Sequence, residues 1–279
     1  MQANYAERLA ETRRLLQDAE YIVIGGGAGL SSAAGLTYAG ERFTQNFADF
    51  IKKYGMTDMY TASFYPFATQ EEKWAYWSRH IFLNRYAPPA LPLYQKLYEL
   101  VREKEHFVLT TNVDYQFHKA GFAPERIFAV QGDYGKIQCA KGCHDKLYDN
   151  EELVHRMVKE QKNCRIHSEL LPKCPVCGGE MEVNVRKDEY FVQDAAWYDA
   201  NMRYGAFMEK ARGKKTLLLE LGVGYNTPAI IRFPFERLTY REKNVYLVRL
   251  NRDYPGGAPE NQKKTIAFRE DMAGVLNSL

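Results

Sequence analysis

Two pairs of cysteines have the spacing of a metal site. Cys139 and Cys143 form the first pair, and Cys174 and Cys177 form the second, on a turn that contains proline and glycine. Two short-spaced thiolate pairs are typical of tetrahedral Zn²⁺ sites, because each tight turn presents two sulfurs. With all four ligands supplied by the protein, no coordination position stays open for chemistry. We therefore predict a structural zinc ion, with Cys164 and the nearby histidines outside its ligand set.

A glycine-rich turn, Gly25–Ser32, follows the short apolar run Tyr21–Ile24. Glycine lets a backbone approach a phosphate closely, and the start of the following helix offers free N–H donors. A turn of this kind can also serve backbone packing alone. It lacks the dehydrogenase fingerprint, since the third glycine would fall on Ser32 and the acid on Asp49, among aromatic residues. The turn therefore favours phosphate binding without identifying the ligand.

Polar side chains follow two further apolar runs. Thr110–Asp114 comes after Phe107–Leu109, and Gln131–Asp133 comes after Ile127–Val130. If both runs are parallel strands, these side chains emerge at the ligand-bearing edge of the sheet. Simpler interpretations stay open, because the first segment could cap a helix and Gln131 could lie in a surface turn.

Apolar runs of strand length alternate with helical patterns along the chain. Strands are expected at 21–24, 107–109, 127–130, 217–219 and 245–248. Helical spacing is seen for Tyr5, Leu9 and Leu16, for Leu93, Leu97, Leu100 and Val101, and for Met272, Val275, Leu276 and Leu279. Continuous apolar strands that alternate with helices favour an α/β fold with a Rossmann-like, doubly wound parallel sheet.

Two segments interrupt this alternation. Residues 40–85 are rich in aromatic side chains and are expected to be helical, with Trp74, Tyr76 and Trp77 either in a core or on a docking surface. Residues 136–187 contain the cysteines and many charges, and they match a sheet core poorly. We predict that both belong to a small domain above the carboxyl ends of the strands. Residues 1–39, 86–135 and 188–279 then form the discontinuous main domain.

The composition argues against several classes of protein. The chain has 279 residues and no apolar run near the roughly 20 residues of a membrane span. Its acidic N-terminus does not match a signal peptide, and five cysteines in mainly metal-type spacing agree with a reducing compartment. A net charge of +3 is too small to argue for nucleic acid. We expect a cytoplasmic protein that binds neither membranes nor nucleic acid.

Together these motifs resemble the sirtuins. The similarity rests on Gly27-Ala28-Gly29-x-Ser31, on Thr110-x-Asn112-Val113-Asp114 with Ala120-Gly121, on Gly132, on the four cysteines, on Gly222 and on Asn251. The resemblance implies an NAD⁺ domain and a small zinc domain with the chemistry between them. It also implies that NAD is bound by Gly27, Ala28, Gly29, Ser31, Asp114, Gly222, Gly224, Asn251 and Asp271.

Departures from the family pattern are equally informative. Sirtuin deacylases carry a histidine directly before the glycine numbered Gly132 here, as general base for a ribose hydroxyl, whereas this chain has Gln131. An amide forms hydrogen bonds but does not accept a proton at neutral pH. The family's Ile-Pro-Asp-Phe-Arg is replaced by Leu36–Arg42, so the aspartate that orients nicotinamide is missing. Thr111 and Phe117 also replace a glutamine and a histidine.

These changes are similar to the bacterial class M sirtuins, which are protein ADP-ribosyltransferases associated with macrodomain hydrolases and lipoyl-carrier acceptors. That resemblance assigns the catalytic roles to Asn112, Gln131 and Arg186; by itself, Arg186 would be taken for a solvated side chain. The predicted function is transfer of one ADP-ribose from NAD⁺ to a protein side chain. Lysine deacylation, NAD⁺ degradation and a non-catalytic NAD or ADP-ribose sensor stay open as alternatives.

Overall fold

A six-stranded parallel sheet forms the larger part of the molecule. The computed structural model describes residues 4–279. The strands lie in the order β3-β2-β1-β7-β8-β9, and each neighbouring pair is parallel. Their bounds are β1 (Tyr21–Gly26), β2 (Glu105–Thr110), β3 (Ile127–Ala129), β7 (Thr216–Leu221), β8 (Val245–Leu250) and β9 (Thr265–Phe268). Because all six run the same way, their carboxyl ends form one edge, where the predicted polar segments begin.

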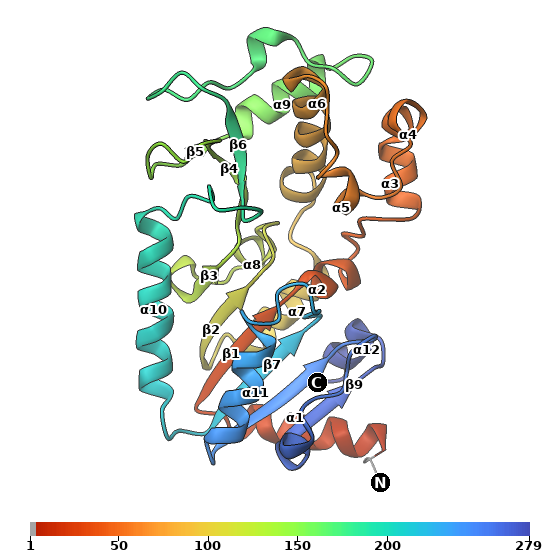
Figure 1. The fold of residues 1–279 in the computed structure, drawn as a ribbon. Coiled ribbons are helices and arrows are strands. Elements are labelled where there is room, and N and C mark those ends of the chain that lie inside the picture. Colours follow the sequence, from red (N-terminus) through yellow and green to blue (C-terminus); the bar gives the residue numbers. More distant parts are fainter. Residues whose placement is uncertain (1–3) are drawn as a thin grey trace.

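Helices cover both faces of this sheet (Figure 1). Alternate side chains of β1 show why: Ile22 and Ile24 pack in one apolar cluster, and Val23 packs in another on the opposite face. The first cluster includes residues of α1 (Tyr5–Asp18), α2 (Ala28–Ala33), α7 (Pro92–Val101), α8 (Gln116–Lys119) and α12 (Met272–Asn277). The second includes residues of α10 (Ala195–Ala211) and α11 (Arg232–Arg241). The predicted doubly wound fold is confirmed.

A second, smaller body lies beyond the carboxyl edge of the sheet (Figure 1). We call it the small lobe, residues 41–86 and 132–185. It contains an antiparallel sheet of β5 (Tyr148–Asp149), β4 (Gly132–Cys139) and β6 (Met181–Val185), in that order. Its helices are α3 (Glu41–Asn46), α4 (Ala48–Tyr54), α5 (Met59–Ala62), α6 (Gln70–Ile81), the π-helix η1 (Phe82–Tyr86) and α9 (Glu151–Glu160). The short 3₁₀ turns of the chain are η2 (Pro124–Arg126), η3 (Ser168–Leu170) and η4 (Pro259–Lys264).

Aromatic side chains fill the interior of the small lobe. Phe43, Phe47 and Phe50 pack with Trp74 and Tyr76 in one buried cluster, and this cluster extends to the small sheet. The helical character predicted for residues 40–85 is confirmed, and Trp74 and Tyr76 belong to the core rather than to a docking surface. The proposed domain boundaries stay a prediction, although the aromatic cluster draws its members from residues 43–81 and 134–183.

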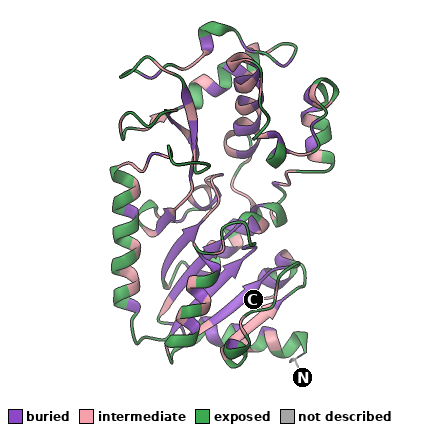
Figure 2. Cartoon of the chain, viewed as in Figure 1, coloured by how far each residue is buried: buried purple, intermediate pink, exposed green. Residues whose placement is uncertain are grey.

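Four strands were not predicted: the three strands of the small sheet and β9. Residues 136–187 are expected to match a sheet core poorly because they contain the cysteines and many charges, yet the small sheet forms there, with Lys136, Gln138 and Glu182 between its apolar residues. The small sheet begins at Gly132, four residues before the predicted boundary, and β9 at the edge of the large sheet was also missed. Figure 2 shows the central strands of the large sheet buried, the edge strand β9 mostly half-buried and the outer side of α10 exposed. No helix within residues 4–279 combines the length and apolar character of a membrane span.

Candidate functional site

The four predicted cysteine ligands lie together at the end of the small sheet. Their sulfur atoms are all within 4.8 Å of one another, with Cys139 Sγ 3.7 Å from Cys177 Sγ and Cys143 Sγ 3.6 Å from Cys174 Sγ. A tetrahedron of Zn–S bonds of about 2.3 Å has edges of about 3.8 Å. The donor set therefore fits a zinc ion that would tie β4 to the turn before β6.

The other candidates near the cysteines stay outside this group, as predicted. Cys164 is buried in the aromatic cluster of the small lobe. His144 is the neighbour in contact: its Nδ1 lies 3.1 Å from Cys143 Sγ, and its Nε2 lies 3.0 Å from the hydroxyl of Tyr148. His144 thus supports a ligand side chain through a hydrogen bond.

Glycines bring the turns after β1 and β7 into backbone contact. A side-chain carbon built on Gly27 would lie 2.6 Å from the carbonyl oxygen of Gly222, and one on Gly29 would lie 2.7 Å from its Cα. Gly222 itself has a φ of 61°, a conformation that favours glycine. The amide of Gly29 donates to the Gly222 carbonyl at 2.9 Å. Gly27, Gly29 and Gly222 therefore form one closely packed backbone surface between β1 and β7, which we call the glycine floor. A side-chain carbon built on Gly224, in contrast, would meet no atom within 4 Å.

A buried chain of hydrogen bonds leads from Asn112 to Asp114; we call it the Asn112 chain. The side-chain nitrogen of Asn112 lies 3.2 Å from the hydroxyl of Tyr94, which lies 2.8 Å from Ser31 Oγ. Ser31 in turn donates to Asp114. Burial raises the pKa of Asp114, against the effect of Ser31 and of the Gln116 amide, which both donate to the carboxylate. Three predicted site residues are thereby joined by Tyr94, which the sequence did not single out.

Gln131 and Arg186 meet through their backbones. The amide of Arg186 donates to the carbonyl of Gln131 at 3.0 Å, so the segment leaving β6 is pinned beside the turn after β3. Gly132 makes this possible, because its φ is 102° and a side-chain carbon there would lie 2.0 Å from the carbonyl oxygen of Asn184. Arg186 is exposed, with its guanidinium carbon 4.6 Å from the centre of the Phe191 ring.

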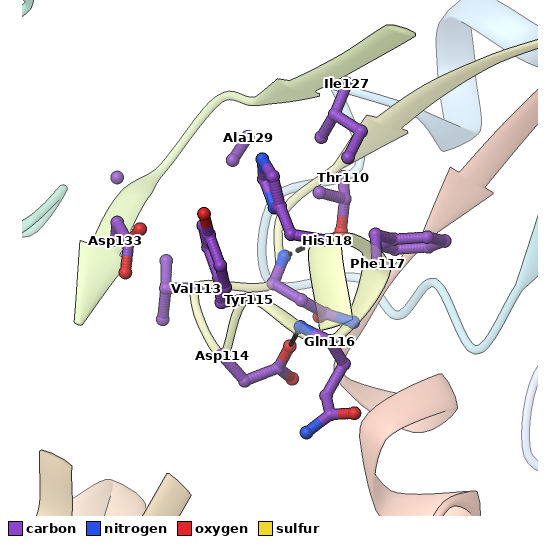
Figure 3. A pocket seen from close by; sticks show the side chains of 12 residues that line it. Thr110, Val113, Asp114, Tyr115, Gln116, Phe117, His118, Ile127, Ala129 and Asp133 are labelled. Atoms are coloured by element: carbon purple, nitrogen blue, oxygen red, sulfur yellow. Dashed lines mark hydrogen bonds between the residues drawn. The ribbon is translucent and has the colours of Figure 1, made fainter. Parts of the chain in front are cut away.

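A small pocket of about 20 Å³ lies at the carboxyl ends of β2 and β3 (Figure 3). Its lining includes Asn112, Gly132 and one histidine, His118. The His118 ring stacks flat on Tyr115, with 3.9 Å between the ring centres and 5° between the planes. Burial lowers the pKa of His118 to about 4. The imidazole is therefore neutral at pH 7 and has little affinity for a proton.

A second buried chain of hydrogen bonds crosses the small lobe; we call it the His80 chain. Tyr76 donates to the carbonyl of Met59 at 2.6 Å, so it accepts from His80 Nδ1 at 3.2 Å. His80 Nε2 must then accept from Tyr134 at 2.9 Å, and Tyr134 accepts from Tyr38 at 2.8 Å. Burial lowers the pKa of His80 to about 3. His80 is therefore a neutral structural residue, 1% exposed, and a poor general base.

The turns after β7 and β8 are joined by Asn251. Its side-chain nitrogen donates to the Val223 carbonyl at 2.8 Å, and its oxygen accepts from the amides of Asp253 and Tyr254. Asp271 caps α12 by accepting from the Gly274 amide at 2.8 Å. Both residues thus have a clear structural task, and their roles in cofactor binding stay predictions, as does that of Ala28, the first residue of α2.

A buried ionic group supports the same turns and was missed by sequence reasoning. Glu220 lies directly opposite Arg249 in neighbouring strands, with Arg249 Nε 2.7 Å from Glu220 Oε1. Arg232 joins them and donates to the carbonyls of Tyr254 and Gly256. The available signal was an acid and a base at matching positions of two otherwise apolar strands.

Comparison with protein families gives one decisive match. The model of the Sir2 family matches residues 27–212, a segment that runs from the glycine turn through the cysteine cluster to α10. The chain belongs to the Sir2 family. Solved Sir2 structures share its fold along nearly the whole chain. One bound to a propionylated peptide has a TM-score of 0.60 at 19% identity and covers 96% of this chain and 95% of its own. A Sir2 homologue in complex with NAD has a TM-score of 0.59 at 17% identity, with 99% and 93% covered.

Two curated relatives are more similar in sequence. A protein ADP-ribosyltransferase of Staphylococcus aureus (strain Mu50 / ATCC 700699) is 39% identical over 267 residues, which cover 95% of this Sir2 chain and 85% of the relative. A probable bifunctional ADP-ribose hydrolase/ADP-ribosyltransferase of Fusarium oxysporum f. sp. cubense is 34% identical over 256 residues. That match covers 87% of this chain but 42% of the fungal protein, which is therefore much longer.

Proposed function

We propose that this chain transfers ADP-ribose from NAD⁺ to a side chain of a protein acceptor and releases nicotinamide. The observation that carries the proposal is that Asn112 and Gln131 follow the carboxyl ends of the neighbouring strands β2 and β3, and that neither side chain can take up a proton at neutral pH. The 39% identity to a protein ADP-ribosyltransferase supports it.

The reaction breaks the bond between the ribose C1 and the nicotinamide nitrogen, whose electron pair leaves with nicotinamide. The acceptor side chain forms the new bond to the same carbon. A carboxylate acceptor is already ionised near neutral pH, so this step needs alignment rather than a base. In the proposal, the glycine floor at Gly27, Gly29 and Gly222 holds the pyrophosphate, and Asn112 and Gln131 orient the ribose and exclude water.

Arg186 is proposed to hold the acceptor or an oxygen of NAD⁺ by a charge-assisted hydrogen bond. Its exposed guanidinium and the backbone bond to Gln131 support this position beside the reacting sugar. The cleft used would lie between the sheet and the small lobe, which a structural zinc ion at the four cysteines would hold folded.

Deacylation receives no support from the histidines near these residues. His80 is buried and His118 is stacked on Tyr115, and burial lowers the pKa of both imidazoles well below neutrality. General-base help is typically worth about 10²–10⁴ in rate, so an enzyme without it should remove acyl groups slowly.

The acceptor and partners belong to the same proposal. By its similarity to class M sirtuins, the chain is proposed to modify a lipoyl-carrier protein in the cytoplasm, with a macrodomain hydrolase that reverses the modification. The fungal relative supports the second part, because its name joins an ADP-ribose hydrolase and a transferase in one chain.

Mass spectrometry of candidate acceptors incubated with NAD⁺ tests this function. We expect a gain of ADP-ribose that depends on the enzyme, and its loss in Asn112→Ala and Gln131→Ala but not in Gln262→Ala, an exposed glutamine of η4. Acylated lysine peptides serve as the competing substrate. Deacylation at the rate of an ordinary sirtuin, without transfer, would overturn the proposal.

A further inference from the structure

The orientation of the Asn112 amide is fixed by its partners. Its side-chain nitrogen lies 3.0 Å from the carbonyl oxygen of Gly27, and a carbonyl can only accept. The NH₂ group must therefore face Gly27, and its second hydrogen points to the Tyr94 hydroxyl at 3.2 Å. With both hydrogens used, Asn112 Oδ1 faces the other way, without a hydrogen-bond partner among residues 4–279.

The hydroxyl of Tyr94 has a fixed direction as well. Ser31 has a single hydroxyl hydrogen, and it donates this hydrogen to Asp114. Ser31 Oγ therefore accepts from Tyr94, whose oxygen stays free to accept from Asn112. The Tyr94 ring is 0% exposed and packs edge-on against Phe117, with 4.9 Å between the ring centres. The hydroxyl has no freedom to turn away.

We propose that Tyr94 is a positioning residue that holds the oxygen of Asn112 toward the ribose next to nicotinamide. This inference rests on the proposed function. An amide turned by 180° would set its oxygen against the Gly27 carbonyl and offer two hydrogens to the sugar. The fixed amide offers an acceptor, so the group it meets must be a donor, which a ribose hydroxyl is. Tyr94 thereby decides which side of an uncharged side chain meets the substrate.

Tyr94→Phe tests this role, because it removes the hydroxyl and keeps the ring. Loss of one orienting hydrogen bond should lower kcat for nicotinamide release and for ADP-ribose transfer by about 3- to 10-fold. The KM for NAD⁺ should stay close to that of the wild type, and the Tm should fall by only a few degrees, because two hydrogen bonds of the buried Tyr94 hydroxyl are lost. Tyr98→Phe is the matched control, since Tyr98 lies one turn further along α7 and its hydroxyl has no partner among residues 4–279.

A double-mutant cycle separates positioning from general damage. In an Asn112→Ala background, Tyr94→Phe should not lower the residual kcat for nicotinamide release any further, because the side chain that it positions is gone. Equal losses in both backgrounds, or an unchanged kcat of Tyr94→Phe, would overturn the inference while leaving the proposed function intact. A wild-type protein that neither cleaves NAD⁺ nor transfers ADP-ribose would overturn both.

Asn112→Asp gives a second test that does not depend on the folding of a Tyr94 variant. Aspartate keeps an oxygen for the ribose but has no hydrogen for Gly27 or Tyr94. If the orientation matters, this variant should lose as much activity as Asn112→Ala. Activity near that of the wild type would show that an oxygen at this position suffices without the hydrogen bonds to Gly27 and Tyr94, and would overturn the inference.

Discussion

The Asn112 chain and the His80 chain are built alike but end differently. Each is a buried, one-directional row of hydrogen bonds that contains tyrosine hydroxyls and one ionisable group. In the first, Asp114 is the terminal acceptor and the opposite end is a half-buried amide. In the second, His80 lies in the middle, and the row ends on the carbonyl of Met59.

Burial acts on the two ionisable groups in opposite directions. It raises the pKa of Asp114 and lowers the pKa of His80, because in both cases it disfavours the charged form. The comparison teaches that burial disfavours charge in both chains, whereas the two side chains proposed to face the ribose, Asn112 and Gln131, are neutral amides. Four experiments test this comparison of the two chains, and they follow in order of decreasing expected effect.

Removal of a zinc ligand should disrupt the His80 chain in the small lobe and leave the Asn112 chain at the large sheet intact. Cys174→Ser leaves three thiolates, and structural zinc contributes roughly 10–16 kcal/mol to the folding of small domains. We expect loss of bound zinc and of hydrogen-exchange protection in β4 and β6, with protection kept in β1, β2 and β7. Retained protection in β4 without metal would contradict this division of the molecule. Cys164→Ser, outside the cluster, is the control.

His80→Leu should destabilise the small lobe by about 2–4 kcal/mol, because Tyr134 and Tyr76 each lose a buried hydrogen-bond partner. Denaturant unfolding measures the change. Tyr38→Phe, which removes only the half-buried first donor, should cost about 1 kcal/mol. Equal costs would mean that the chain is not organised around the imidazole.

Acid should weaken the His80 chain. The folded pKa of His80, about 3, lies below its ordinary value of 6.5, so its contribution is complete above pH 6.5. The contribution is lost as the pH falls from 6.5 towards 3, by up to about 1.4 kcal/mol per pH unit. His118 and His106, whose pKa values are also lowered, add slopes of the same sign. The measurement is the free energy of unfolding of the wild type and of His80→Gln between pH 4 and 7. Plotted against pH, the two slopes should differ by up to about 1.4 kcal/mol per pH unit, which corresponds to close to one bound proton.

The contribution of Asp114 to the free energy of unfolding should change with pH in the opposite direction to that of His80, and this is the smallest of the four expected effects. Its folded pKa is raised above 3.8, so its contribution is complete below pH 3.8 and is lost as the pH rises through the folded pKa. The free energy of unfolding of Asp114→Asn, relative to the wild type, should rise over this range and stay within about 1 kcal/mol at pH 7. A constant difference from pH 3 to 7 would show that Asp114 titrates normally.

Five of the six strands of the large sheet could be predicted from the sequence because they are continuous apolar runs, whereas the edge strand β9 is only partly buried. Gly27, Gly29 and Gly222 were also recognisable, since a turn after such a strand demands glycine where backbones touch. The cysteine cluster followed from spacing alone. Each of these features is local, so a single segment carries the signal.

The features that could not be predicted depend on contacts between residues that lie far apart in the sequence. Tyr94 has the helical spacing of a core residue, and nothing nearby indicates that its hydroxyl meets Ser31, 63 positions away. His80 and Tyr134 are separated by 54 positions and meet only when the small lobe closes. The strands of the small sheet are short and interrupted by polar residues that face neighbouring loops, as Gln138 does towards Tyr190 and Val192.

The segment that follows the first glycine turn is fastened to the small lobe by hydrogen bonds of Thr37 and Tyr38. The Thr37 carbonyl accepts from Arg42 Nη1 at 2.9 Å. The Tyr38 hydroxyl binds Tyr134, and the Tyr38 carbonyl accepts from the Met59 amide at 2.8 Å. Ser31 lies only seven positions earlier and is anchored to the large sheet through Asp114. A movement of the small lobe relative to the sheet would therefore strain the short segment between Ser31 and Tyr38 or break these hydrogen bonds. Any widening of the proposed cleft would then also disturb the glycine turn at the start of this segment.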